Sequence, residues 1–265
     1  MKKNLLVIIS TFFAFSLLTA CRGDEPSARS DENGGTGYLK LSEVSIDAVV
    51  EAHPFGRSVD AINIEIIDSE GSQVGSYPYS EIAGKTLALP AGVYNVRAEA
   101  GDNVEAAFAS PYYEGELNDL EIKNNLVSEP DPIECRLANV KVTVRISPKL
   151  RAQLSDDATV TVTNMLNDAA LTFTLTECDA ETAGYFGHFQ PDMQLVAVFN
   201  ATMGTTPITA TTVCTEVVRG QHRILTYALK DDTGFEEGCE PSPGDDEPVG
   251  GTSKAINKTI KIECR

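Results

Sequence analysis

The chain of 265 residues contains no tryptophan and only three histidines. His53, His188 and His222 stand singly, without the HxH or HExxH spacing that places two imidazole ligands on one metal ion. The sequence also lacks a GxSxG elbow, a P-loop and a dinucleotide-binding glycine pattern. We therefore expect no metal, no cofactor and no catalytic residues, and surface or turn positions for the histidines.

Basic residues are scarce, with 21 Lys and Arg against 39 Asp and Glu. This balance gives a formal net charge of −18 that is spread along the chain. Nucleic acids and anionic lipid head groups would be repelled by such a surface, so the composition argues against both as partners.

The N-terminus has the three parts of an export signal. Lys2 and Lys3 precede an apolar stretch that Ser10, Thr11 and Ser16 interrupt and that is shorter than the roughly 20 residues a bilayer-spanning helix needs. The stretch ends in the sequence LTAC at residues 18–21, which resembles the lipobox that bacterial lipoprotein signal peptidase cuts. We therefore expect residues 1–20 to be a signal peptide and Cys21 to carry the lipid.

The residues after Cys21 predict where the lipoprotein is sorted. Asp directly after the cysteine would imply retention at the inner membrane, but the residue is Arg22, which favours the outer membrane. The following Asp24 and Glu25 are similar to the short acidic export tags of Bacteroidetes surface lipoproteins. We expect a lipid-anchored protein of the cell outer membrane, exposed at the surface.

Five cysteines remain besides Cys21, and this odd count leaves at least one of them unpaired or paired between chains. They are Cys135, Cys178, Cys214, Cys239 and Cys264. None of their spacings is a CxxC or other zinc pattern. An exported location permits disulfides without requiring them, so the pairing stays open.

The remainder of the chain alternates between apolar and polar residues with the period of β-strands. Residues 21–37 are polar and glycine-rich and predict a flexible tether, after which alternating runs begin at Tyr38. The clearest run, residues 85–100, predicts a hairpin with its turn at residues 90–92. Two prolines in the segment 124–132 indicate a domain boundary. We expect a first β-sandwich over residues 38–130.

Residues 131–265 show the same pattern and predict a second β-sandwich. Strands are expected at 140–146, 159–163, 171–175, 194–199, 213–218, 223–229 and 256–264, with one short helix near 148–154. The acidic segment 231–251, rich in glycine and proline, is read as a mobile loop of open role. The fold class is thus all-β, with two tandem sandwiches.

Four stretches carry a family resemblance: YLKLSEVSID from residue 38, LPAGVYNVRAEAG from 89, AFASPYYEG from 107 and CRLANVKVTVRISPKL from 135. They resemble a family of Bacteroidetes lipoproteins of unknown function and, more distantly, the fimbrillin-type pilus subunits and anchor proteins. The resemblance implies two transthyretin-like sandwiches and a non-enzymatic role in surface adhesion or in a fimbria-like assembly.

A glycan-binding surface lipoprotein of a polysaccharide-utilisation system is the alternative function. The rings of Tyr112, Tyr113, Tyr185 and Phe186 could stack on sugars, although tyrosines near strand ends are more often the amphipathic rim of a core. Other partners would be surface or fimbrial proteins. We expect a monomer, because the last strand should close its own sandwich and bury Ile260 and Ile262.

The first prediction concerns the anchor. Replacing Cys21 with Ser should abolish incorporation of a clickable fatty acid, because the thiol is the acceptor of the lipid. Metabolic labelling of cells that produce the wild type and the Cys21→Ser variant measures this. Label that persists in the variant would show that the lipid is attached elsewhere.

Overall fold

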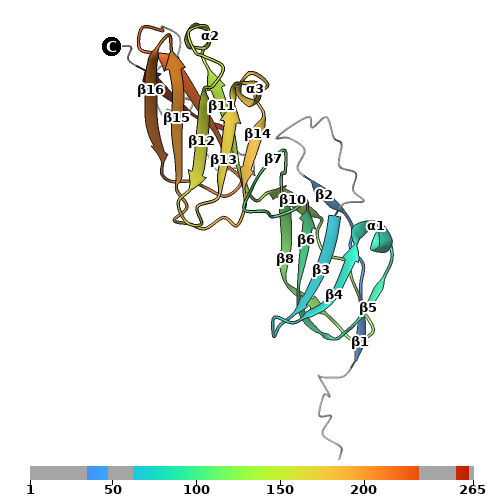
Figure 1. Cartoon of the computed structure of the whole chain (residues 1–265). Helices are drawn as coiled ribbons and strands as arrows, with labels where there is room; N and C mark the ends of the chain where they lie inside the picture. Colours follow the sequence, from blue (N-terminus) through green and yellow to red (C-terminus); the bar gives the residue numbers. More distant parts are fainter. Residues whose placement is uncertain (1–34, 47–61, 233–254, 263–265) are drawn as a thin grey trace, which may run out of the picture. The chain divides into compact units, whose positions relative to one another are not determined.

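The computed structural model describes residues 35–46, 62–232 and 255–262, with the backbone alone at residues 255–259 (Figure 1). Cys21, the predicted signal peptide and most of the predicted tether and acidic loop lie outside these ranges. All described residues belong to one unit of the chain, Asn33–Arg265. No helix among them is long and apolar enough to cross a membrane. The prediction of an all-β fold is confirmed.

The first sandwich consists of a three-stranded and a six-stranded sheet that share one hydrophobic core. In the three-stranded sheet the order is β5 (Leu87–Pro90), β1 (Thr36–Leu39), β9 (Val127–Ser128). In the six-stranded sheet it is β2 (Val44–Ile46), β10 (Ile133–Leu137), β8 (Tyr113–Ile122), β6 (Gly92–Ala100), β3 (Ile62–Asp68), β4 (Gln73–Pro78).

The alternation of β6 explains why this strand has one dry and one wet face. Tyr94, Val96 and Ala98 are buried, while Arg97 and Glu99 point to the opposite side. In β3 every second residue is likewise buried: Ile62, Ile64 and Ile66 are at most 1% exposed. The outward residues of these strands are thereby brought together on one surface.

The predicted hairpin at residues 85–100 is wrong in its pairing. Both strands exist, but β5 pairs with β1 in one sheet, whereas β6 pairs with β3 and β8 in the other. The Ala91 N–H between them donates to the carbonyl of Gly35, in the approach to β1. Alternation identifies strands and their faces, but the neighbour of each strand depends on contacts distant in sequence.

The second sandwich consists of a five-stranded and a four-stranded sheet. The five-stranded order is β18 (Ala255–Ile262), β17 (His222–Leu229), β11 (Val140–Ile146), β14 (Ala183–Phe186), β7 (Ala106–Phe108). The four-stranded order is β13 (Ala170–Thr174), β12 (Thr159–Asn164), β15 (Leu195–Met203), β16 (Thr206–Cys214). Phe199 of β15 stacks on Tyr227 of β17, with ring centroids 4.8 Å apart, so the core joins the two sheets.

Strand pairing crosses the predicted boundary at residues 130 and 131 in both directions. β10 follows the boundary but pairs with β8 and β2 of the first sandwich. β7 precedes it but pairs with β14, and Phe108 packs edge-on against Phe173 with centroids 5.0 Å apart. The division of the chain into domains 38–130 and 131–265 therefore stays a prediction.

Within the described residues, three short helices interrupt the strands: α1 (Tyr79–Ile82), α2 (Pro148–Arg151) and α3 (Leu175–Asp179). α2 confirms the predicted helix and is capped by Ser147, whose hydroxyl accepts from the N–H of Leu150. α3 was missed, although Thr174 and Glu177 form a capping box that a T-x-x-E spacing signals.

The predicted last strand is confirmed as β18. It pairs in parallel with β17 of its own sandwich over its whole length. Ile262 is 6% exposed and lies in the second core, against which the half-buried Ile260 also packs. The end of the chain therefore closes the sheet that precedes it.

Core truncation should destabilise this fold strongly. Ile64→Ala removes a side chain that is 0% exposed, so we expect a loss of about 2–5 kcal/mol in the free energy of unfolding. Val74→Ala, on the neighbouring strand β4 and 44% exposed, is the matched control and should change it by less than about 0.5 kcal/mol. Urea unfolding measures both, and equal losses would contradict the assigned faces.

Candidate functional site

The four aromatic residues predicted to contact a ligand are all buried. Tyr112, Tyr113, Tyr185 and Phe186 are 5%, 8%, 1% and 0% exposed. Tyr113 and Tyr185 lie together in the first core, whereas Phe186 lies in the second. Burial and a hydrogen bond to Glu99 raise the pKa of Tyr112. Contact of these rings with a sugar stays a prediction, and it would require the core around them to open.

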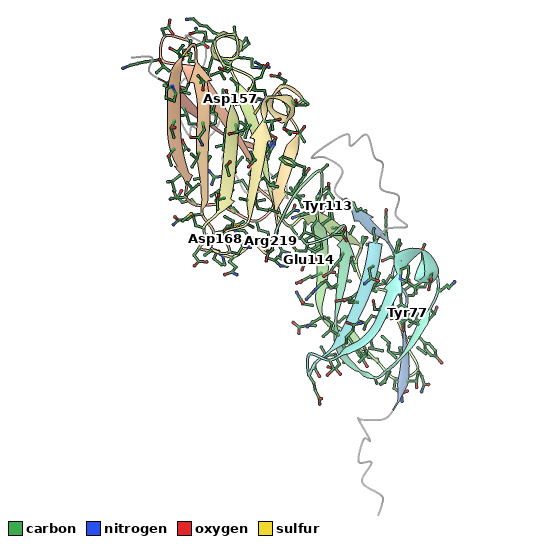
Figure 2. All side chains as sticks on the ribbon, viewed as in Figure 1. Tyr77, Tyr113, Glu114, Asp157, Asp168 and Arg219 are labelled. Atoms are coloured by element: carbon green, nitrogen blue, oxygen red, sulfur yellow. The ribbon has the colours of Figure 1, made fainter. Side chains whose placement is uncertain are left out.

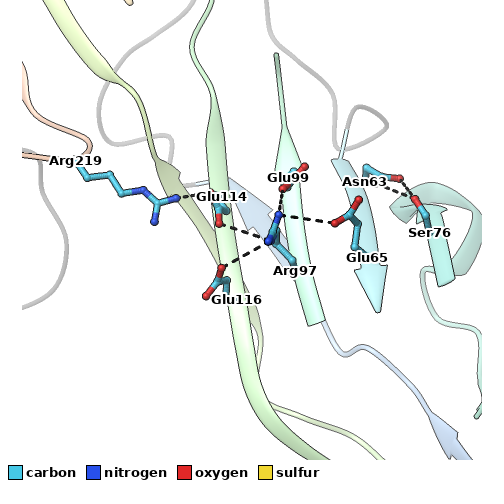
Figure 3. A network of polar contacts seen from close by, with 8 residues as sticks. All are labelled: Asn63, Glu65, Ser76, Arg97, Glu99, Glu114, Glu116 and Arg219. Atoms are coloured by element: carbon cyan, nitrogen blue, oxygen red, sulfur yellow. Dashed lines mark hydrogen bonds and ion pairs between the residues drawn. The ribbon is translucent and has the colours of Figure 1, made fainter. Parts of the chain in front are cut away.

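A network of charged side chains covers the outer face of the six-stranded sheet (Figure 3). Arg97 of β6 is at its centre, because cross-strand register places Glu65 of β3 and Glu116 of β8 directly opposite it. Its guanidinium lies 2.9 Å from Glu99, 3.9 Å from Glu65, and 3.8 Å from both Glu114 and Glu116. The hydrogen bond to Glu99 raises the pKa of Arg97, so its charge is permanent.

Glu114 connects this network to a second cation. Arg219, in the connection between β16 and β17, forms an ion pair with it. Burial raises the pKa of Glu114, and a hydrogen bond to Glu116 acts in the same direction, while Arg219 and Arg97 lower it. Two cations thus share the charge of the surrounding carboxylates.

Among the described residues no group of three or more His, Cys, Asp or Glu is arranged to hold a metal ion.

A second polar cluster lies on β11 and β17. Lys141 is 3% exposed and stands opposite His222 in the parallel pairing, and the Nε2 atom of His222 lies 3.0 Å from the hydroxyl of Thr143. Burial lowers the pKa of Lys141 to about 8. Burial, assisted by Lys141 and Arg145, lowers the pKa of His222 to about 4.

Clustered pKa shifts are typical of catalytic sites, but the shift of His222 does not suit a general base. A general base works best with a pKa near the operating pH, and an imidazole with a pKa of about 4 binds protons too weakly. The shift follows first from burial, as for any ionisable group taken into a core. His222 is best described as a neutral hydrogen-bond partner of Thr143.

The thiols of Cys135 and Cys178 are also unsuited to chemistry. Both are buried free thiols, and Cys214 is buried as well. Burial raises the pKa of both Cys135 and Cys178 to about 12, so neither thiol ionises near neutral pH. The side chains of Cys239 and Cys264 lie outside the described residues, and their pairing stays open.

The outer face of the four-stranded sheet has a different chemistry, which sequence reasoning missed. The side chains that point outward are threonines, small apolar residues and one asparagine, none of them charged. They are Thr159, Thr161, Thr163, Ala170, Thr172, Thr174, Val196, Val198, Asn200, Thr202, Pro207, Thr209, Thr211 and Val213. We call this surface the threonine face. The signal was present in TVTVT at residues 159–163 and in TPITATTV at 206–213.

The threonine face is regular. The three pairings of its strands run without a register shift, unlike the pairings of β3 with β4 and of β6 with β8. Hydroxyl contacts cross the strands: Thr161 and Thr172 are 3.1 Å apart, and Thr209 donates to Asn200 at 3.0 Å. Asp157 and Asp168 lie at opposite ends of the sheet in Figure 2. The result is a regular, hydroxyl-bearing and uncharged surface.

Comparison with known proteins adds a family and several distant structures. The family described as "Domain of unknown function (DUF4493)" matches residues 35–245. No curated protein matches the chain.

The similar solved structures share little sequence with the chain. A proposed cell adhesion protein from Bacteroides eggerthii is 10% identical, with 86% of this chain and 98% of that chain covered and a TM-score of 0.40. A proposed adhesin from Bacteroides ovatus is 11% identical, with 75% and 88% covered and a TM-score of 0.38. Proposed polysaccharide binding proteins from Bacteroides thetaiotaomicron are 13% identical, with 64% and 78% covered and a TM-score of 0.39. Similarity at this level does not assign a role.

The low pKa of His222 predicts how stability depends on pH. The unfolded chain binds a proton on this imidazole below its ordinary pKa of about 6.5, whereas the folded chain does so only near 4. Stability should therefore fall as the pH falls from 6.5 to 4, by about 1–2 kcal/mol after discounting for solvent screening.

Urea unfolding of the wild type and of His222→Gln at both pH values measures this contribution. The variant should lose less stability over the interval, since the glutamine does not titrate. His188→Gln, at an exposed position, is the control and should keep the pH dependence of the wild type. If His222→Gln keeps it as well, the dependence comes from other groups.

Proposed function

The chain belongs to the DUF4493 family, and from that premise we propose that it is a non-enzymatic lipoprotein of the outer membrane. In this proposal it mediates adhesion at the cell surface or forms a structural or accessory part of a fimbria-like assembly. The function of the family is unknown, so the support comes from the residues of this chain.

The sequence LTAC at residues 18–21 supports the anchor. Each methylene of a lipid chain buried in the membrane contributes about 0.8 kcal/mol, so several acyl chains on Cys21 would hold the protein almost irreversibly. An anchored protein meets its partners at high local concentration, and many copies act together. Weak binding by each copy is then sufficient for adhesion.

The threonine face is the observation that carries the adhesive role. The chain has a net charge of −18, so most of its surface repels other acidic surfaces. The outward residues of β12, β13, β15 and β16 carry no charge, and their hydroxyls both donate and accept hydrogen bonds. Each such bond contributes about 0.5–1.5 kcal/mol, so a broad contact can accumulate affinity without charge complementarity.

The polar clusters support a non-enzymatic role. The Arg97 network is a set of exposed and half-exposed ion pairs, each worth about 0–1 kcal/mol. His222 is too weak a base, and the thiols of Cys135 and Cys178 stay protonated. These groups act in the stability of the sheets on which they lie.

Glycan binding is the second candidate function, and the same face favours it. Threonine hydroxyls and the Asn200 amide suit the hydroxyls of a neutral sugar, and the regular rows of side chains suit an extended chain. We further propose that the protein acts as a monomer, which the pairing of β18 within its own sandwich supports.

One added charge tests the threonine face. Beads coated with the chain should be retained on an array that carries extracellular proteins and glycans. Thr211→Glu, in the middle of β16, should reduce retention at least about threefold, because a carboxylate at the contact must be desolvated. Gln73→Glu, on the exposed strand β4, adds the same charge elsewhere and should leave retention unchanged.

The pattern of retention separates the candidates. Retention on neutral glycans alone, lost in Thr211→Glu, supports the second function, whereas retention on proteins supports the first. Equal retention of both variants would reject the threonine face as the adhesive surface.

A further inference from the structure

The three-stranded sheet exposes an apolar surface beside the point where the chain enters the described structure. Tyr38 of β1, Leu126 and Val127 are 38%, 55% and 54% exposed. The exposed Ala88 and Pro90 of β5 belong to the same surface. We call these five residues the β1 patch. None of them is charged, in a chain of which 23% is charged.

Strand register explains why the patch is continuous. Tyr38 stands opposite Ala88 on one side and Val127 on the other, so the three side chains form a row on one face of the sheet. Thr36 and Pro90 form the next outward pair. The N–H of Tyr38 donates to the carbonyl of Leu126 at 2.9 Å, so the backbone of this exposed residue adjoins the row. The opposite face contributes Leu39 and Leu89 to the first core.

The charges around the patch are already paired. Lys40, next to β1, lies 2.8 Å from Glu129, next to β9. Lys123 lies 3.1 Å from Glu121, at the end of β8. Each of these two pairs at the rim joins one positive and one negative group. Such a rim matches a zwitterionic head-group layer, whereas an anionic one would be repelled by the chain as a whole.

The position of the patch along the chain indicates its occupant. Residues 22–35 span at most about 50 Å when fully extended. Gly35 begins the described structure, and its carbonyl accepts from Ala91 at the end of the β5–β1 pair. If Cys21 carries a lipid, the β1 patch is the part of the described fold that is tied to the bilayer by the shortest length of chain. A tyrosine beside aliphatic residues is the combination that favours the membrane interface.

We propose that the β1 patch rests on the phospholipid bilayer, with Leu126 and Val127 at the depth of the head groups and Tyr38 beside them. This inference depends on the lipid at Cys21 that is part of the proposed function. The lipid supplies the affinity, and the patch fixes which side of the first sandwich faces the membrane.

The absence of tryptophan makes the proposal directly testable. Leu126→Trp places a single indole in the patch, and Val218→Trp places one at an equally exposed position in the second sandwich, 56% against 55%. The full-length lipidated variants are reconstituted into phosphatidylcholine vesicles with and without brominated acyl chains. Bromine should quench Leu126→Trp at least about twofold and leave Val218→Trp unchanged. Adding Val127→Asp to Leu126→Trp should relieve the quenching.

The outcomes separate the patch from the anchor. Vesicle-bound Leu126→Trp without quenching would overturn the inference and leave the anchor intact. If the chain carries no lipid at Cys21 and does not bind vesicles, both the inference about the β1 patch and the proposed anchor are overturned. If the emission of Leu126→Trp shifts with protein concentration in the absence of vesicles, a second copy occupies the patch and the bilayer proposal is wrong.

Discussion

The two-residue period of the β-strand is the constraint on which the other features of this protein depend. Each inward residue that packs into a core fixes an outward neighbour on the same strand. Burial of Val96 and Ala98 sets Arg97 between them on the outer face, and burial of Val160 and Val162 sets Thr161 on another. Packing of the cores therefore fixes which positions point outward, while the residue type at each outward position can vary.

The outer faces carry different types of side chain at these positions. Around Arg97, four carboxylates surround one guanidinium, and Arg219 pairs with one of them. On the threonine face the same strand geometry carries hydroxyls, each of which has one donor and two acceptor positions. On the β1 patch it carries apolar groups that water disfavours. The alternation of the strands thus places ion pairs, hydroxyls and apolar side chains on three different surfaces.

Alternation in the sequence predicted the all-β class, the closing strand and strands such as 140–146 and 159–163, because these depend on local pattern. The strand predicted at 213–218 is wrong, since β16 begins at Thr206 and ends at Cys214. Alternation could not predict that β5 and β6 join different sheets, since that depends on the Gly35 carbonyl far away in sequence. It placed Tyr185 and Phe186 among candidate ligand contacts because tyrosine and phenylalanine suit both cores and surfaces. Their burial, at 1% and 0% exposure, follows from the packing of β14 between strands distant in sequence. The threonine face could be predicted from TVTVT at residues 159–163 and TPITATTV at 206–213, because neither run contains a charged residue.

Charge decides which surfaces an acidic protein can use. With a net charge of −18, close approach to another acidic surface or to a neighbouring copy is opposed by a repulsion that acts within about 8–10 Å at physiological salt and is screened beyond that distance. Inside that distance the uncharged surfaces are the ones that gain from contact without first losing the hydration of an ion. The threonine face and the β1 patch meet this condition and belong to different sandwiches. An acidic exterior with uncharged contact surfaces therefore favours weak, selective binding over nonspecific association, which agrees with the anchored, adhesive role proposed above.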